Sequence, residues 1–329
     1  MTLEYRFTRM PFVRSRYILP LLLVTACALP RQSEARFEYR QRHMGIEARV
    51  VLYAPQEAVA QRAARAAFAR IALLDSLLSD YRVDSELNRL SAGAGGPAVP
   101  VSEELFFVLS RAQEMARHSD GAFDVTVGPL VQLWREARRS GRMPSEEARS
   151  EAMERTGWRY LRLDATTRTA QLLRPGMRLD LGGIAKGYAA DQAIAALRAE
   201  GVDRALVEMG GDIVAGNPPP GTRGWQLRLM DADSTDPPQL LANAAISTSG
   251  DTEQFVELAG ERYSHVVDPA TGLGLRSRIA ATVIAPDGVT ADALSTTLTV
   301  LGPERGEALV ARHFPGVRAR VRRVAEPSS

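Results

Sequence analysis

The chain has 329 residues, of which 45% are hydrophobic, 24% charged and 6% aromatic, and this composition excludes a mainly disordered chain, a coiled coil and a collagen-like fibre. Its 41 basic and 39 acidic residues give a formal net charge of +2, so the chain as a whole lacks the basic excess of a nucleic-acid-binding protein. The single cysteine excludes a disulfide framework and a cysteine-rich metal site.

The N-terminal segment has the pattern of a bacterial export signal. A basic segment precedes an apolar stretch over residues 17–26, which is too short to span the ~30 Å hydrocarbon core of a membrane as a helix. Val24-Thr-Ala-Cys27 resembles a lipobox, whose cysteine is lipidated and becomes the mature N-terminus; an ordinary secretory signal with an incidental cysteine is the alternative. We expect a signal peptide over residues 1–26, a lipidated tether over 27–35, and a membrane-anchored protein that faces the periplasm, held through Cys27.

The first half of the mature chain is predicted to be mainly helical. One strand is expected over residues 46–53, and Ser102 has the position of an N-cap before a helical segment. Segments without interior glycine or proline predict helices over residues 56–80, 102–118 and 130–139, with another that starts at Pro144. A loop rich in glycine, alanine and proline is expected over 91–100.

The second half is predicted to be rich in strands. Strands are expected over residues 160–163, 170–173, 177–181, 205–209, 225–230, 244–248, 255–258 and 279–285, and helices over 187–200, 290–301 and 303–313. An arginine-rich strand and a frayed tail are expected at the C-terminus. This order favours an α+β architecture with antiparallel sheets over a series of βαβ units. Strands and helices interleave, so we assign residues 36–325 to one domain.

Lys186 is the only lysine among the 41 basic residues, and all the others are arginines. It lies in Leu179-Asp-Leu-Gly-Gly-Ile-Ala-Lys-Gly-Tyr188, where a double glycine precedes a predicted helix. Glycines allow a ligand to approach the backbone, and a helix N-terminus attracts anions. The segment therefore predicts an anion site at Lys186; a tight turn with a surface lysine is the alternative. The Walker sequence is absent.

Two further turns follow predicted strands. Gly210-Gly-Asp212 does not complete the dinucleotide fingerprint Gly-x-Gly-x-x-Gly, so it fits a ligand-binding turn or a simple hairpin. Ala245-Ile-Ser-Thr-Ser-Gly-Asp251 offers hydroxyl groups to a ligand or to its own backbone, and it lacks the Gly-x-Ser-x-Gly sequence of a nucleophile elbow. Neither turn assigns a function by itself.

His265 and Asp292 are candidates for base and metal chemistry. His265 precedes the turn Asp268-Pro-Ala-Thr-Gly272 and suits proton transfer near neutral pH, although a lone histidine is more often structural. If the segment from Thr290 is helical, Asp292 and Thr296 share one face, and a carboxylate with a hydroxyl suits Mg²⁺. A role in the first turn of the helix is the alternative for Asp292. The other histidines lack a zinc-ligand spacing.

Taken together, these segments resemble the FAD:protein FMN transferases of the ApbE family. The matching segments are His43-Met-Gly45, Tyr81-Arg-Val-Asp-Ser-Glu86, Gly121-Ala-Phe-Asp-Val-Thr-Val-Gly-Pro-Leu130, Leu179-Asp-Leu-Gly-Gly-Ile-Ala-Lys-Gly-Tyr188, Gly210-Gly-Asp212, Ile246-Ser-Thr-Ser-Gly-Asp251, Ser264-His-Val-Val-Asp-Pro-Ala-Thr-Gly272 and Ala291-Asp-Ala-Leu-Ser-Thr296. They occur in the family's order over nearly the whole mature chain, and such an ordered set is more specific than any single motif.

The resemblance implies a two-lobed α+β fold with flanking helices, in which FAD and Mg²⁺ bind in the cleft between the lobes. A Ser or Thr hydroxyl of an acceptor flavoprotein would attack the FMN-side phosphorus of FAD, so that FMN stays attached through a phosphoester and AMP leaves. By match of motif, FAD would contact Met44, Tyr81, Ala122, Phe123, Asp124, Asp180, Lys186 and Leu275. Mg²⁺ would be held by the Gly183 carbonyl with Asp292 and Thr296. His265 would be the base, and Lys186 a second positive charge at the pyrophosphate.

The chain departs from the family after the histidine turn. The family usually has Thr-Gly-Arg/Lys-Pro-Val/Ile there, whereas this chain has Thr271-Gly-Leu-Gly-Leu275. Two other functions fit the same resemblance: an Mg²⁺-dependent FAD pyrophosphatase that gives FMN and AMP, and a non-catalytic FAD-binding lipoprotein. Intact His265, Asp292 and Thr296 argue against the last. The expected acceptor is a membrane or periplasmic electron-transfer protein.

Overall fold

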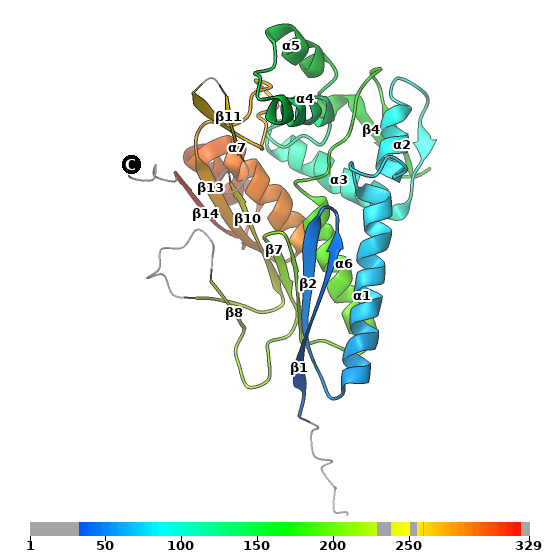
Figure 1. Ribbon diagram of the computed structural model, residues 1–329, viewed down its shortest axis with the longest axis vertical. Coiled ribbons are helices and arrows are strands. Elements are labelled where there is room, and N and C mark those ends of the chain that lie inside the picture. Colours follow the sequence, from blue (N-terminus) through cyan, green and yellow to red (C-terminus); the bar gives the residue numbers. More distant parts are fainter. Residues whose placement is uncertain (1–32, 229–237, 251–254, 259, 324–329) are drawn as a thin grey trace, which may run out of the picture. The chain divides into compact units, whose positions relative to one another are not determined.

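The computed structural model describes residues 33–228, 238–250, 255–258 and 260–323. Its largest sheet has seven strands, all paired antiparallel, in the order β1-β2-β6-β7-β10-β13-β14 (Figure 1). The strands are β1 (Ala35–His43), β2 (Ile46–Ala54), β6 (Ala205–Met209), β7 (Asp212–Ala215), β10 (Ala244–Gly250), β13 (Ile279–Ala285) and β14 (Arg318–Arg323). The predicted antiparallel α+β architecture is therefore confirmed. Cys27 lies outside the described residues.

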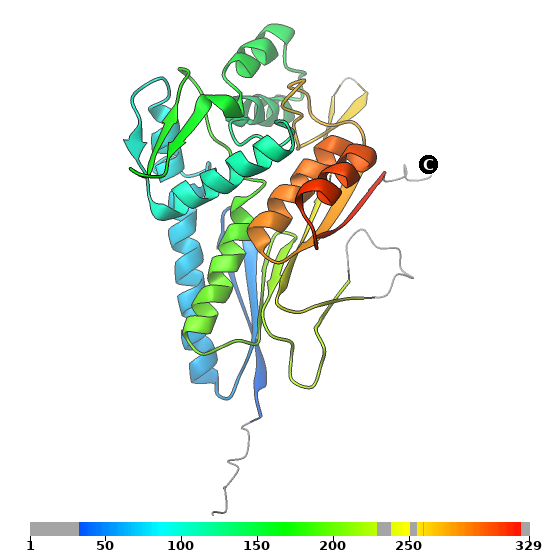
Figure 2. The ribbon, with the colours of Figure 1, turned by 180° about the vertical axis from the view of Figure 1, so that it is seen from behind.

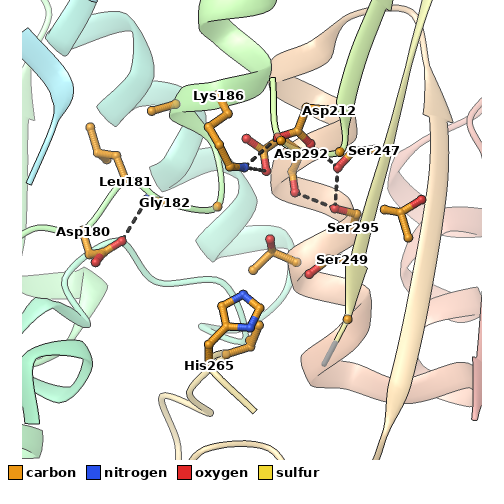
Figure 3. Close-up of a pocket in the computed structure, with 18 of the residues that line it drawn as sticks. Asp180, Leu181, Gly182, Lys186, Asp212, Ser247, Ser249, His265, Asp292 and Ser295 are labelled. Atoms are coloured by element: carbon orange, nitrogen blue, oxygen red, sulfur yellow. Dashed lines mark hydrogen bonds and ion pairs between the residues drawn. The ribbon is translucent and has the colours of Figure 1, made fainter. Parts of the chain in front are cut away.

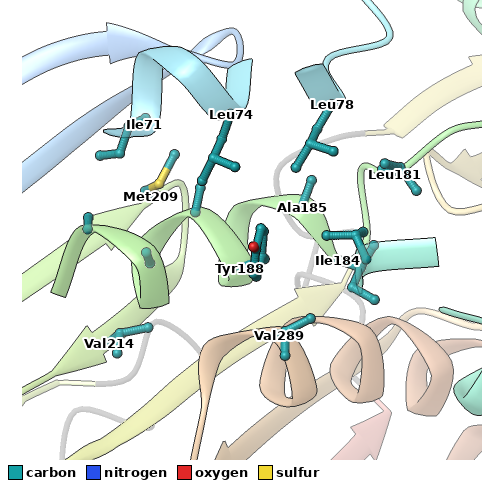
Figure 4. Packing of buried hydrophobic residues seen from close by; sticks show 14 of the residues in the cluster. Ile71, Leu74, Leu78, Leu181, Ile184, Ala185, Tyr188, Met209, Val214 and Val289 are labelled. Atoms are coloured by element: carbon teal, nitrogen blue, oxygen red, sulfur yellow. The ribbon is translucent and has the colours of Figure 1, made fainter. Parts of the chain in front are cut away.

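Three long helices cover one face of this sheet: α1 (Glu57–Leu78), α6 (Ala185–Ala199) and α7 (Gly288–His313) (Figures 1 and 2). Alternate residues of β2, from Ala48 to Ala54, are buried beneath them, as the period of a strand requires. Figure 4 shows Leu74 and Leu78 of α1 packed over the start of α6, at Ala185 and Tyr188. This packing fixes the N-terminal end of α6, which carries Lys186.

The opposite face of the sheet carries a smaller buried cluster. It consists of Val51, Leu206, Ala215, Trp225, Leu241 and Ile246. Trp225 and Leu241 come from a separate two-stranded sheet, β8 (Trp225–Leu227) and β9 (Gln239–Leu241). The large sheet is therefore covered by helices on one face and partly by a hairpin on the other.

The remaining elements form a smaller subdomain at one end of the large sheet (Figure 1). It contains α2 (Glu86–Ala92), α3 (Glu103–His118), α4 (Gly128–Ser140), α5 (Glu146–Glu154), the 3₁₀ turn Trp158–Tyr160, and a sheet of β3 (Val99–Pro100), β5 (Thr169–Leu172) and β4 (Leu161–Asp164). The hairpin of β11 (Phe255–Leu258) and β12 (Glu261–Ser264) packs beside α4, where Trp134 lies 5.0 Å from Tyr263 between ring centroids.

Most of the predicted helices and strands are confirmed. Ser102 caps α3 as predicted, because its Oγ accepts a hydrogen bond of 3.2 Å from the backbone nitrogen of Leu105. The division predicted between helices over residues 290–301 and 303–313 is confirmed, because α7 is interrupted by a kink at Gly302, whose backbone is non-helical (φ 77°). The predicted arginine-rich C-terminal strand is β14.

The strand predicted over residues 177–181 is wrong. This segment forms only a single β-bridge, between Arg178 and Val127. Its backbone nitrogens are bound instead by loop groups, with Asp180 donating to the Val125 carbonyl at 2.8 Å. The alternating pattern that suggested a strand comes from the burial of Met177, Leu179 and Leu181 in the main core. An extended segment that approaches a helix produces the same apolar alternation as a strand.

Several short elements were not predicted. They are β1, α2, β3, β7, β9 and β12, and the predicted loop over residues 91–100 accordingly overlaps α2 and β3. β1 begins at Ala35, one residue before the start of the predicted domain. Among the residues that the structure describes, no helix has both the length and the hydropathy needed to cross a bilayer.

Candidate active site

A cavity of about 1050 Å³ lies between the smaller subdomain and the large sheet (Figure 3). Its volume is slightly above the range of ~300–1,000 Å³ usual for ligand pockets. Most of the site residues predicted from the sequence line it: Met44, Tyr81, Ala122, Phe123, Asp124, Asp180, Gly183, Lys186, His265, Asp292 and Thr296. The fold therefore brings segments from residue 44 to residue 296 to one place.

Lys186 lies between two buried carboxylates at the sheet end of the cavity (Figure 3). Its Nζ donates a hydrogen bond of 2.6 Å to Asp212 Oδ2 and lies 3.6 Å from Asp292 Oδ1. The side chains of both acids are at most 5% exposed. The Lys186 side chain is 25% exposed and faces the cavity between these acids, so the alternative of a surface lysine outside any site is wrong.

The acids are fixed by further hydrogen bonds. Ser247 Oγ donates to Asp212 Oδ1 at 2.5 Å and lies 2.9 Å from Ser295 Oγ, and both serines are buried. The backbone nitrogen of Gly187 donates to Asp292 Oδ2 at 3.0 Å. A buried network in which each polar atom has a partner holds its geometry rigidly. Asp212 and Ser247, which come from the two turns that the sequence left open, therefore line the same cavity as Lys186.

Two backbone features bring these groups together. The hairpin between β6 and β7 turns at Gly210 and Gly211, whose φ values of 60° and 95° favour glycine. At Gly187 the helices α6 and α7 approach so closely that a Cβ would lie 2.1 Å from the Gly288 carbonyl oxygen. The β6–β7 hairpin places Asp212 beside Lys186. The close packing of α6 against α7 places Asp292 beside the same ammonium.

The charges in this group shift one another's pKa values. Burial lowers the pKa of Lys186, but the Asp212 and Asp292 carboxylates outweigh it, so the pKa is raised and the ammonium stays charged. Burial and the Asp212 carboxylate raise the pKa of Asp292 to about 7, although Lys186 acts in the opposite direction. A further cation beside Asp292 would favour its ionised form.

Asp292, Thr296 and Gly183 provide oxygen donors of the types that Mg²⁺ prefers: a carboxylate, a hydroxyl and a backbone carbonyl. Gly183 lies against Thr296, because a Cβ on Gly183 would meet Thr296 Oγ1 at 3.0 Å. Within the described ranges, no cluster of three or more His, Cys, Asp or Glu side chains is arranged to hold a metal. The donor set therefore fits Mg²⁺ bound through few protein ligands and shared with substrate phosphates, as is usual for this ion.

His265 enters the cavity from the segment after β12 and points toward the Lys186 group (Figure 3). The turn that follows it is closed by Asp268, whose carboxylate accepts hydrogen bonds from Ala270 at 2.9 Å and Thr271 at 3.0 Å. Trp134 Nε1 donates to the Gly272 carbonyl at 2.9 Å and ties this turn to α4. The predicted turn is confirmed, and it positions an imidazole at the cavity wall.

Asp124 lines the cavity but is also bound within its own loop. Its Oδ1 accepts from the nitrogen and the hydroxyl of Thr126, both at 2.7 Å, and its Oδ2 accepts from the Trp158 nitrogen at 2.8 Å. Burial raises the pKa of Asp124 against these hydrogen bonds. The carboxylate therefore shapes the wall of the cavity on which Ala122 and Phe123 lie.

Leu275 is placed outside the cavity lining. Its backbone nitrogen donates to the Val266 carbonyl at 2.9 Å, and its carbonyl accepts from Ser264 at 2.8 Å. These bonds fix the chain on both sides of His265. The proposed contact of Leu275 with FAD stays a prediction.

Sequence patterns did not indicate Arg135 or Ser295 as site residues. Arg135 lines the cavity from α4, pairs with Asp80, and lies 3.1 Å from Asp180 Oδ2. Burial and the neighbouring Asp80 raise the pKa of Asp180 to about 6, and Arg135 acts in the opposite direction. No pattern marked Arg135, because α4 also carries Arg138 and Arg139.

Comparison with known proteins settles the family. The model of the ApbE family matches residues 44–321. The chain belongs to the ApbE family. Two relatives named FAD:protein FMN transferase are similar to it. The protein of Treponema pallidum is 36% identical to this chain, over 84% of this chain and 81% of its own length. That of Escherichia coli K12 is 34% identical over 72% of this chain and 70% of its own length.

Solved structures of the ApbE family confirm the fold. The apo flavinyl transferase ApbE of Pseudomonas stutzeri has a TM-score of 0.75 and 31% identity, over 88% of this chain and 92% of that one. The ApbE protein of Thermotoga maritima has a TM-score of 0.78 and 30% identity, over 88% and 97%. The expected ApbE-like fold is therefore the observed one.

Proposed function

We propose that this chain is an Mg²⁺-dependent FAD:protein FMN transferase, which attaches FMN to a Ser or Thr hydroxyl of an acceptor flavoprotein and releases AMP. The names of its relatives support the reaction class. One observation carries the proposal for this chain: Lys186, between the carboxylates of Asp212 and Asp292, shares a single cavity with His265. With Mg²⁺ bound, the group of Lys186, Asp212 and Asp292 would have the positive charge that a diphosphate needs, and His265 would be the base for the hydroxyl.

Mg²⁺ would be held by Asp292, Thr296 and the Gly183 carbonyl. When bound, it would reduce the negative charge on the pyrophosphate oxygens and favour departure of AMP. Lys186 supplies a fixed positive charge beside the same position, and its hydrogen bond to Asp212 holds the ammonium in place. Preorganised charge of this kind is the main contribution to phosphoryl transfer.

His265 would accept the proton of the incoming Ser or Thr hydroxyl. The hydroxyl oxygen forms a bond to the FMN-side phosphorus, the bond from that phosphorus to the bridging oxygen breaks, and AMP leaves with the bridging oxygen. Proton removal by a positioned base contributes ~10²–10⁴ in rate. Met44, Tyr81, Ala122, Phe123, Asp124, Asp180, Lys186 and Leu275 are the proposed FAD contacts.

The test is to incubate the purified chain with FAD, Mg²⁺ and a candidate acceptor, and to measure the mass of the acceptor. A gain of one FMN, with release of AMP, supports transfer. Free FMN and AMP with an unmodified acceptor would support the alternative, an FAD pyrophosphatase, in which water replaces the hydroxyl. His265→Ala is expected to lose transfer and to retain FAD affinity, whereas the matched control His313→Ala, outside the cavity, should transfer normally.

The chain would act at a membrane surface. The N-terminal signal ending in Val24-Thr-Ala-Cys27 supports a lipid anchor and export to the periplasm. An acceptor within reach of such an anchor would be a membrane-bound or periplasmic electron-transfer protein. The near-neutral net charge gives no support for a nucleic-acid partner.

A further inference from the structure

Tyr81 is a large aromatic side chain that is exposed at the wall of the cavity. It is 68% exposed and lines the cavity from the loop between α1 and α2. An exposed aromatic ring offers a flat apolar surface to a planar ligand. The affinity that this ring contributes depends on how well its orientation is fixed before the ligand binds, because ordering a side chain on binding costs free energy.

The backbone on both sides of Tyr81 is held in place by one residue. The side-chain amide of Asn88 donates to the carbonyls of Asp80 at 2.9 Å and Arg82 at 2.8 Å. Asn88 belongs to α2, whose N-cap Ser85 accepts a hydrogen bond from the Asn88 backbone nitrogen at 3.0 Å. The loop is therefore anchored to a capped helix, and only the ring of Tyr81 remains to be oriented.

Arg135 is the residue that contacts this ring. Its Cζ lies 4.5 Å from the centroid of the Tyr81 ring, within cation–π distance. The same guanidinium pairs with Asp80, the neighbour of Tyr81, and donates to Asp180 Oδ2 at 3.1 Å. The side chains of the two acids are only 16% and 12% exposed. A planar fork fixed by two carboxylates is held in one orientation, which a lysine would not be.

We infer that Arg135 is a positioning residue for the dinucleotide: it covers one face of the Tyr81 ring and leaves the other face to stack on a planar ring system of the ligand. This inference rests on the proposed function, because FAD is the ligand with such rings. Arg135 acts through Tyr81 and need not touch FAD. The two carboxylates fix the guanidinium, the guanidinium fixes the ring, and the cavity gains a preformed stacking surface.

The test is a double-mutant cycle read as the dissociation constant of FAD, from flavin fluorescence. R135Q and Y81L are each expected to weaken FAD binding about tenfold. Y81L/R135Q is expected to bind within about twofold of Y81L alone, because Arg135 has no ring left to orient. The matched control is R139Q on the same helix, since Arg139 lies outside the cavity lining and its side chain is 80% exposed; it should change affinity less than twofold.

Each outcome is decisive. If R135Q weakens FAD binding equally in the wild-type and Y81L backgrounds, or if R139Q matches R135Q, Arg135 acts through charge or folding and the inference is wrong. If R135Q does not fold, R135K, which keeps a positive charge between Asp80 and Asp180, replaces it in the same cycle with the same expectation. Failure of the wild-type protein to bind FAD would overturn the proposed function itself, whereas normal FAD binding and transfer by R135Q would overturn only this inference.

Discussion

Lys186 Nζ donates a hydrogen bond of 2.6 Å to Asp212 Oδ2, and this bond joins the first turn of α6 to the hairpin between β6 and β7. The same nitrogen lies 3.6 Å from Asp292 Oδ1 on α7. One ammonium thus links three elements around the cavity, at the place where the proposed reaction needs positive charge.

Replacement of Lys186 by methionine should destabilise the fold as well as stop turnover. The change leaves two carboxylates, at most 5% exposed, without their shared cation, and removal of one partner of a buried pair costs about 3 kcal/mol. We expect the free energy of unfolding, measured with urea, to fall by this amount. The control Arg198→Met, near the exposed end of the same helix, should change it by about 0.5 kcal/mol or less. Equal stability of the two variants would contradict the arrangement.

Replacement of Asp292 by asparagine should remove Mg²⁺-dependent turnover. The variant keeps the size of the side chain and loses the one ionised ligand proposed for the metal. Several kcal/mol of charge stabilisation correspond to a loss of about a thousandfold in turnover of FAD. Titration with Mn²⁺, followed by its electron paramagnetic resonance signal, should show weaker binding. Asp84→Asn, exposed outside the cavity, serves as control, and wild-type metal affinity in the Asp292 variant would exclude the assignment.

Sequence alone identified Lys186 because a single lysine among arginines is conspicuous, and the ordered motifs identified most of the cavity wall. Asp212 was recognised only as part of a turn, since its partner lies 26 positions away in the chain and meets it only when the sheet forms. Arg135 gave no signal at all, because Arg138 and Arg139 on the same helix have the same chemistry. Only the packing of α4 decides which arginine faces Asp80 and Asp180.

Local patterns also failed where a long-range contact determines the backbone. Residues 177–181 alternate like a strand, but their hydrogen-bond partners are the Val125 carbonyl and the Ser91 hydroxyl. The short strand β7 is half of the hairpin that orients Asp212, and it exists because β6 and β10 flank it. Hydrogen bonds to segments distant in the chain therefore determine the conformation of these elements, which local sequence patterns did not predict.

Replacement of Cys27 by alanine should release the protein from the membrane. Lipid chains on this residue would anchor the protein, and the substitution removes the attachment point. After cell fractionation, the wild type should sediment with the membranes, whereas Cys27→Ala should be found in the soluble fraction or remain as an uncleaved precursor. Transfer activity with FAD and Mg²⁺ in detergent should be unchanged. Labelling by radioactive palmitate would be the direct check, and its absence from the wild type would contradict a lipid anchor.

The stability of the fold should decrease at acidic pH through a pair of stacked histidines. The rings of His118 and His313, near the C-terminal ends of α3 and α7, lie 4.4 Å apart between centroids and within 15° of parallel. Desolvation of the ring, with the nearby His118 and Arg312, lowers the pKa of His313 below its usual value. The folded protein therefore binds this proton more weakly than the unfolded chain does.

The sign of the effect follows from proton linkage. A histidine whose pKa is lower in the folded state contributes stability that is present above the unfolded value of about 6.5 and is lost as the pH falls through the folded value. We expect urea unfolding between about pH 7.5 and about pH 5 to show a smaller loss of stability for His313→Gln than for the wild type. At about pH 8, where the His313 imidazole is neutral, its protonation should contribute nothing to the difference between the two proteins. An equal loss in both proteins on acidification would show that this pair does not couple folding to protonation.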